Sequence, residues 1–426
     1  MGSKRALALA GGGSRGAYQI GVWQALREYG VDYQIVTGTS VGALNGAMFV
    51  QGDYDEARQL WLRLTSQDVA NVDLSQAAEA PDPARAVYAE FLRQAVAGGG
   101  VDIGGLETIM RAVVDEKRFR ASPVDFGLVT VEYPSLRPVT MCKADIPPGK
   151  LCDYLIASAS CFPAFPTKLI DDVQFIDGGY HDNLPINLAV ELGAEEVIAV
   201  DLESVGIRQR PKNVSVPITW IRPQHSLGPF LLFEPDSAGR NMTLGYLDAL
   251  RALGRAEGAY LTFRPGETGK LMDSLRPALE EAVSWLEDPE GGLLSLLPQR
   301  RREDWPERCR QAVQQLGQWY ELEETLLYTA HSFSYELLLR FNAQEAEPSS
   351  EIAEVFSRAG TALQLAGQLS VFGRRQLCGF IFTRLRESAL GYGNRRELQH
   401  IAAVLQNETA AALLIFALKR TLAEEE

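Results

Sequence analysis

A serine stands in a glycine-flanked turn near the start of the chain, in a pattern that suits nucleophilic catalysis. Gly38, Ser40 and Gly42 satisfy Gly-x-Ser-x-Gly, after an apolar stretch at 33–37 and before a helical pattern. When a strand ends in a sharp turn at a serine, the serine hydroxyl is exposed. The helix that follows directs free backbone N–H groups and the positive end of its dipole at a developing oxyanion. These residue types therefore predict that Ser40 forms a covalent intermediate with an acyl group.

Three consecutive glycines end the first strand pattern of the chain. Gly11, Gly12 and Gly13 are followed by Arg15 and Gly16 as a helical pattern begins. Without side chains, these residues leave their N–H groups uncovered and let a substrate approach closely, which is what an oxyanion hole requires. Arg15 adds a permanent cation that would either contact a ligand or brace the loop.

The same glycine segment, at 11–16, also fits the Gly-x-Gly-x-x-Gly pattern of dinucleotide-binding proteins. That function requires an acidic residue at the end of the second strand, about 20 residues further on. Here the second strand ends at Gly38 without a carboxylate, and Asp32 lies before it. A dinucleotide site is therefore excluded and no cofactor is expected. No group of ligating residues has a spacing that predicts a metal.

The base that would activate Ser40 is either a carboxylate or a histidine. Asp177 follows an apolar strand pattern at 173–176 and precedes a glycine turn, and His181 lies four residues later. An ordinary α/β-hydrolase places its serine after several strands, whereas Ser40 follows only the second. From the residues alone, Asp177 and His181 both remain candidates, and a purely turn-forming role for Asp177 is also open.

Three motifs in this order resemble those of bacterial-type patatin-like phospholipases. They are Gly-Gly-Gly-Ser-Arg-Gly at 11–16, Gly-Thr-Ser-Val-Gly at 38–42 and Asp-Gly-Gly at 177–179. The segments at 157–165 and 182–185 are similar to the usual surroundings of the family's aspartate. The resemblance covers roughly residues 5–264 and says nothing about 265–426.

The resemblance implies a Ser–Asp dyad, with Ser40 as nucleophile, Asp177 as base and no catalytic role for His181. It assigns the oxyanion hole to the backbone of three glycines and gives supporting roles to other motif residues. The hole residues are Gly11, Gly12 and Gly13, and the supporting residues are Arg15, Gly16, Gly38, Gly42 and Gly178. The implied activity is hydrolysis of lipid acyl esters, as a phospholipase, lysophospholipase or general lipid esterase. Because an ordinary carboxylate is a weak base for a hydroxyl, burial has to raise the pKa of Asp177.

The elements that would position these residues change in character along the chain. Strand and helix patterns alternate up to about residue 263, which predicts an α/β fold with a doubly wound, mainly parallel sheet between helices. Helical periodicity dominates from 270 onward. We therefore expect a patatin-like α/β hydrolase domain at 1–265 and an appended α-helical domain at 266–426. Its most apolar segment, 410–418, fits a core or dimer-interface helix better than a membrane-touching one.

Composition limits the partners. The net charge of −14 and a pI near 5.0 exclude nucleic acid as an expected partner and provide no overall attraction to anionic lipid. No run of about 18 apolar residues is present. We expect a cytoplasmic protein, peripheral at most at the inner membrane face. Its expected substrate is a lipid or fatty-acyl ester reached by transient membrane-surface contact, and a homodimer through the C-terminal helices is a further hypothesis.

Two other functions fit the same motifs. A thioesterase or acyltransferase would use the same serine on a different acyl donor or acceptor. In a non-catalytic binding module, the C-terminal helices would bind a partner and the α/β part would only carry them. Reaction with a serine-directed probe separates the second alternative from an enzyme.

Overall fold

The computed structural model divides into two compact units, Met1–Gly254 and Arg255–Glu426. It describes residues 4–70, 74–98, 101, 103–213, 215–286, 305–343, 349–358, 368–369 and 371–425. The domain boundary predicted at 265/266 lies inside the second unit, between the strand Thr262–Phe263 (β10) and the helix Glu267–Ser284 (α12). The assignment of separate domains to 1–265 and 266–426 stays a prediction.

The first unit is built on an eight-stranded sheet in the order β5-β6-β3-β2-β1-β7-β8, with β4 paired to β3. Its strands are β1 (Arg5–Leu9), β2 (Ile35–Thr39), β3 (Asp125–Tyr133), β4 (Pro138–Cys142), β5 (Lys168–Ile170), β6 (Val173–Asp177), β7 (Glu196–Val200) and β8 (Ile218–Ile221). The pairings from β3 through β2, β1 and β7 to β8 are parallel. Those of β3 with β4 and β6, and of β5 with β6, are antiparallel. The sheet is mainly parallel, as predicted.

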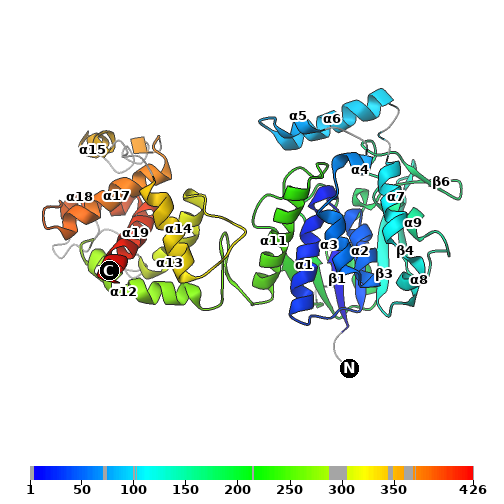
Figure 1. Cartoon of the computed structure of the whole chain (residues 1–426), viewed down its shortest axis with the longest axis horizontal. Helices are drawn as coiled ribbons and strands as arrows, with labels where there is room; N and C mark the ends of the chain where they lie inside the picture. The colour runs from blue at the N-terminus through cyan, green and yellow to red at the C-terminus, as the bar shows by residue number, and fades with distance from the viewer. Residues whose placement is uncertain are drawn as a thin grey trace. The chain divides into compact units, whose positions relative to one another are not determined.

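Helices cover both faces of this sheet. In chain order, the helical elements are η1 (Gly13–Gly16), α1 (Ala17–Glu28), α2 (Val41–Gln51), α3 (Tyr54–Trp61), α4 (Ser66–Ala70), α5 (Ser75–Ala78), α6 (Pro83–Gly98), α7 (Gly104–Val113), α8 (Glu116–Ala121), α9 (Leu151–Ser158), η2 (Gly178–Tyr180), α10 (Ile186–Glu191) and α11 (Pro235–Ala252). Figure 1 shows α1, α3 and α11 packed side by side.

Two consecutive residues of β2 show that the helices lie on opposite faces. A Cβ placed on Gly46 of α2 would lie 3.2 Å from Val36. The hydroxyl of Thr37 donates to the carbonyl of Pro185, which precedes α10, at 2.9 Å. Because successive strand side chains point to opposite faces, α2 and α10 sandwich the sheet between them. The doubly wound arrangement is therefore confirmed.

The second unit is mainly helical and contains a small sheet. Its helices are α12, α13 (Trp305–Trp319), α14 (Ala330–Asn342), α15 (Ser349–Arg358), α17 (Arg374–Ala389), α18 (Arg395–Val404) and α19 (Gln406–Glu425), and its sheet has the order β11-β10-β9. The strands β9 (Glu257–Gly258) and β11 (Leu327–Tyr328) have two residues each. The helical periodicity that dominates from 270 onward did not indicate β11.

The apolar segment 410–418 lies within α19, which packs against α12, α13 and α17 (Figure 1). Every residue of the segment is buried, the most exposed being Phe416 at 6%. The interpretation as a core helix is confirmed, so this segment is not a surface available to a second copy or to lipid. In the described part of the chain, no helix combines the length and hydrophobicity of a membrane span.

Candidate active site

Ser40 occupies a strained turn between β2 and α2. It is the N-cap of α2 and has φ 56° and ψ −128°, a conformation that non-glycine residues rarely adopt. Its carbonyl accepts hydrogen bonds from the amides of Ala43 and Leu44, which begins the helix. A Cβ at Gly42 would lie 2.3 Å from the carbonyl oxygen of Leu9. The helix therefore starts in contact with β1, as a nucleophile elbow requires.

Strand register brings Asp177 to the same place. β3 lies between β2 and β6, with Thr39 paired to Val129 and Asp177 paired to Thr130. The ends of β2 and β6 therefore lie on either side of neighbouring residues of β3. The two strand ends are separated from each other by two strand spacings. A Cβ at Gly178 would lie 2.9 Å from the methyl group of Thr39. The two predicted turns thus meet beside β3.

Ser158, which no sequence motif marked as part of the site, holds the turn at Ser40 in place by hydrogen bonds. The buried hydroxyl of Ser158, at the end of α9, accepts a hydrogen bond from the Ser40 amide at 3.0 Å and donates to the Val129 carbonyl at 2.7 Å. Two residues later, the carbonyl of Ser160 accepts from the Asp177 amide at 2.8 Å. The segment after α9 therefore holds both turns.

The environment of Asp177 favours a proton acceptor of unusual basicity. Its side chain is 6% exposed and accepts a hydrogen bond from the Gly179 amide at 2.7 Å. Burial raises the pKa of Asp177 from 3.8 to about 6, and hydrogen bonding from the Ser40 side chain and the Gly179 amide lowers it in part. The rise has the direction that the sequence analysis required of a base.

The glycine loop lies directly beside the serine, because a Cβ at Gly11 would be 3.0 Å from the Cβ of Ser40. Gly11 itself is held by Asn183: its amide donates to the Asn183 carbonyl at 3.0 Å, and the Asn183 side-chain amide donates to the Gly11 carbonyl at 3.2 Å. Among the described residues, no acceptor is assigned to the amides of Gly12 and Gly13. These two amides, rather than that of Gly11, remain available to an oxyanion.

Arg15 braces the loops around the site. Its guanidinium donates to the carbonyls of Gly228 at 2.8 Å, Glu203 at 3.0 Å and Leu202 at 3.3 Å. The structure shows the bracing role, and because Arg15 also lines the cavity that contains Ser40 and Asp177, contact with a ligand stays a prediction. Burial lowers the pKa of Arg15.

Ser40 and Asp177 both line a cavity of about 810 Å³. Apolar side chains from α2, α3, α4, α7 and the segment 229–233 form a large part of its walls, and Gly12 and Gly13 also line it. Its size and apolar lining suit a hydrophobic ligand. His181 is not among the lining residues. Cys161 is, but burial raises the pKa of its thiol to about 12, which keeps it protonated.

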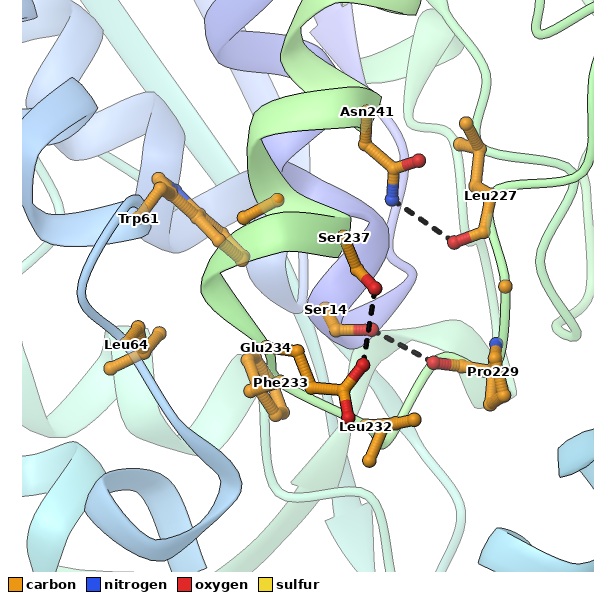
Figure 2. A pocket seen from close by; sticks show the side chains of 12 residues that line it. Ser14, Trp61, Leu64, Leu227, Pro229, Leu232, Phe233, Glu234, Ser237 and Asn241 are labelled. Carbon is orange, nitrogen blue, oxygen red and sulfur yellow. Dashed lines mark hydrogen bonds between the residues drawn. The ribbon is translucent and has the colours of Figure 1, made fainter. Parts of the chain in front are cut away.

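The segment 229–233 is tied to the glycine loop beside a second, much smaller cavity of about 20 Å³ (Figure 2). The Ser14 hydroxyl donates to the Pro229 carbonyl at 2.9 Å, and the Ser14 amide donates to the Phe230 carbonyl at 2.8 Å. On α11, the side-chain amide of Asn241 donates to the Leu227 carbonyl at 3.0 Å. These bonds fix one wall of the large cavity relative to the loop that carries Gly12 and Gly13.

Comparison with known proteins finds relatives that match about half of this chain. Lysophospholipase nte1 of Aspergillus terreus is 28% identical over 206 residues, which are 47% of this chain and 12% of that protein. Patatin-like phospholipase domain-containing protein 7 of Mus musculus is 28% identical over 210 residues, which are 48% of this chain and 14% of that protein. The chain thus spans only a small fraction of the length of these relatives.

Among solved structures, VipD from Legionella pneumophila has a TM-score of 0.37 and 14% identity, with 97% of this chain and 91% of that chain covered. Residues 7–190 match the family model described as patatin-like phospholipase. The chain carries a patatin-like phospholipase domain over these residues.

Proposed function

We propose that the protein hydrolyses lipid acyl esters through an acyl-serine intermediate, with Ser40 as nucleophile and Asp177 as base. The observation that carries the proposal is the position of Ser40: a strained serine lies beside a buried carboxylate at the wall of a large apolar cavity. The family match and the names of the relatives support a lipid substrate.

In the proposed reaction, the hydroxyl oxygen of Ser40 attacks the ester carbonyl carbon while Asp177 takes its proton. The amides of Gly12 and Gly13 donate to the oxyanion of the tetrahedral intermediate. When the intermediate collapses, Asp177 returns the proton to the departing alcohol. Water, deprotonated by Asp177, then attacks the acyl-serine carbonyl carbon. As the bond to the Ser40 oxygen breaks, Asp177 returns this proton to that oxygen and the fatty acid is released. The apolar walls limit water around Asp177 and so sustain its raised pKa.

The rim of the cavity also suits contact with a lipid surface. Val205 and Ile207 line the cavity, although 89% and 54% of their surfaces are exposed. The carbonyl of Gly179 accepts from the Ile207 amide at 2.9 Å, which ties this exposed apolar loop to the turn after Asp177. Such a rim would touch the lipid aggregate from which a substrate enters, in keeping with transient membrane-surface contact.

A lipid panel tests the proposed function. We expect the protein to release free fatty acid from a phospholipid, a lysophospholipid or a monoacylglycerol, measured by mass spectrometry, and we expect no release by the variant Ser40→Ala. Turnover confined to an acyl-CoA would favour the thioesterase alternative. No turnover of any acyl compound would contradict the proposal.

The rate should depend on pH through Asp177. Because burial raises its pKa to about 6, we expect kcat/KM to fall by about tenfold per pH unit below that value, as protonated Asp177 cannot accept the serine proton. Burial also raises the pKa of Asp182 to about 6, so this residue could produce an inflection at the same pH. Because we assign the inflection to Asp177, we expect it to persist in the variant Asp182→Asn. A flat profile from pH 8 to pH 5, with circular dichroism showing folded protein throughout, would remove Asp177 as the base.

A further inference from the structure

The apolar cavity is elongated, and it extends along one face of α2. Val41, Leu44, Asn45 and Met48 all line it, at the three- and four-residue spacing of one helix face. Ser40 is the N-cap of this helix. With a rise of about 1.5 Å per residue, Leu44 and Met48 lie about 6 Å and 12 Å along the helix axis from Ser40. The cavity therefore runs along α2 for two turns beyond the nucleophile.

A second wall comes from α7. Leu106, Ile109, Met110 and Val113 line the cavity, and their spacing again places them on one face of a helix. The wall is apolar over its whole length, so it offers nothing to a polar head group and suits a hydrocarbon chain.

The two helices come together at the far end. The side-chain amide of Gln51, the last residue of α2, donates to the Val113 carbonyl at 3.2 Å, and its oxygen accepts from the Asp115 amide at 2.9 Å. Gln51 lies three residues after Met48 but is not among the cavity-lining residues. The corridor between α2 and α7 thus closes beyond Met48 and Val113.

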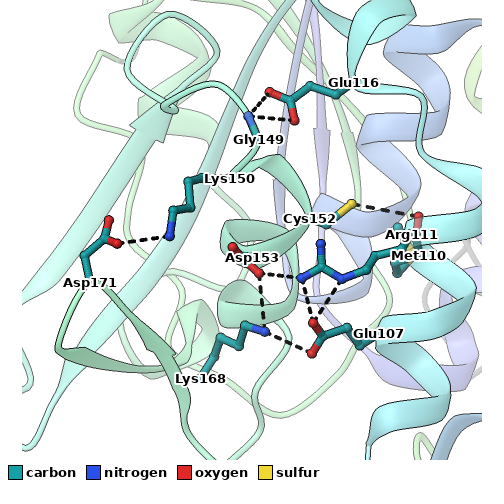
Figure 3. A network of polar contacts seen from close by, with 10 residues as sticks. All are labelled: Glu107, Met110, Arg111, Glu116, Gly149, Lys150, Cys152, Asp153, Lys168 and Asp171. Atoms are coloured by element: carbon teal, nitrogen blue, oxygen red, sulfur yellow. Dashed lines mark hydrogen bonds and ion pairs between the residues drawn. The ribbon is translucent and has the colours of Figure 1, made fainter.

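Charged residues hold α7 in place from its other side (Figure 3). Arg111 pairs with Glu107 of the same helix and with Asp153 of α9, both at 2.7 Å. Lys168 of β5 pairs with Glu107 at 2.9 Å and with Asp153 at 3.4 Å. Near the start of α7, a Cβ at Gly105 would lie 2.0 Å from the Asp68 carbonyl, so the helix also sits tightly against α4. A long ligand cannot easily push this wall outward.

On the basis of the proposed acyl-ester hydrolysis, we propose that the acyl chain of the substrate lies along α2 between α2 and α7, and that Met48 and Val113 set its maximum length. The ester carbonyl lies at Ser40 and the methyl end of the chain lies against these two side chains. A larger side chain at Val113 shortens the corridor, and a smaller one at Met48 lengthens it.

Binding of fatty acids, the products of the reaction, tests this proposal without requiring turnover. In the Ser40→Ala protein, displacement of a fluorescent fatty acid gives the Kd of hexanoate, decanoate and dodecanoate. We expect Val113→Phe to raise the Kd of decanoate at least about tenfold while that of hexanoate changes less than about twofold. In the otherwise unsubstituted protein, the same change should lower kcat/KM for a p-nitrophenyl decanoate ester but not for a butanoate ester.

Val173→Phe is the matched control, because Val173 is exposed on β6 and does not line the cavity. It should leave all chain lengths unaffected. If circular dichroism shows that Val113→Phe does not fold, Met48→Ala decides: it should keep decanoate binding and improve that of dodecanoate. Equal effects on all lengths, or no effect of either substitution, would overturn the proposal. If binding depends on chain length but no ester is turned over, the proposed position of the acyl chain between α2 and α7 is supported and the proposed hydrolysis is contradicted.

Discussion

Replacing Ser40 by Ala should lower kcat for ester hydrolysis by roughly 10⁴-fold or more, because no other group supplies the attacking oxygen. Only one atom is lost, and the Ser40 amide, its carbonyl bonds to α2 and the backbone conformation of the turn are retained. The change is measured with p-nitrophenyl butanoate and with a lysophospholipid.

Ser135→Ala is the matched control for this experiment. Ser135 is exposed in the turn between β3 and β4 and does not line the cavity, so its rate should equal that of the unsubstituted protein. Circular dichroism should show both variants folded. Unchanged turnover by folded Ser40→Ala would mean that another residue performs the attack.

Replacing Asp177 by Asn should lower kcat by about 10³-fold or more, because the amide cannot accept the proton of Ser40. The variant keeps the shape of the side chain and an oxygen that can accept from the Gly179 amide. The remaining activity should come from the oxyanion donors and substrate binding, and it should lose the pH dependence near pH 6.

The free energy of unfolding of Asp177→Asn shows whether the variant has lost only its base or has also lost its fold. Burial raises the folded-state pKa of Asp177 above its unfolded value of 3.8, so its ionisation opposes folding more strongly as the pH rises from 3.8 through about 6. Neutral Asn removes that unfavourable contribution. At pH 8, we therefore expect Asp177→Asn to unfold at an equal or higher urea concentration than the unsubstituted protein. Full activity in this variant would refute the dyad.

The tight turns of the site and the buried strands that precede them could be predicted from the sequence. Glycines around Ser40 and Asp177 signal tight turns, and apolar runs such as 6–10 signal strands buried in a parallel sheet. From these patterns the mainly parallel α/β architecture follows. The convergence of Ser40 and Asp177 depends on strand order, which places β3 between them, and no local pattern specifies that order.

Other features lack a local signal. The walls of the cavity come from residues such as Met110 and Val113, whose spacing looks the same whether a helix faces a core or a ligand. The bonds that join Gly11 to Asn183 connect positions 172 residues apart. They occupy the amide of Gly11, so the oxyanion donors that we propose are the amides of Gly12 and Gly13, and no local sequence pattern signals this.

Reaction with a long-chain fluorophosphonate, followed by peptide mapping, tests most directly whether Ser40 is an activated nucleophile. We expect one covalent adduct per chain, on the peptide that contains Ser40, with slower labelling in Asp177→Asn and in the presence of excess fatty acid. An adduct on a different residue, or an unlabelled Ser40 in folded protein that still hydrolyses esters, would contradict it.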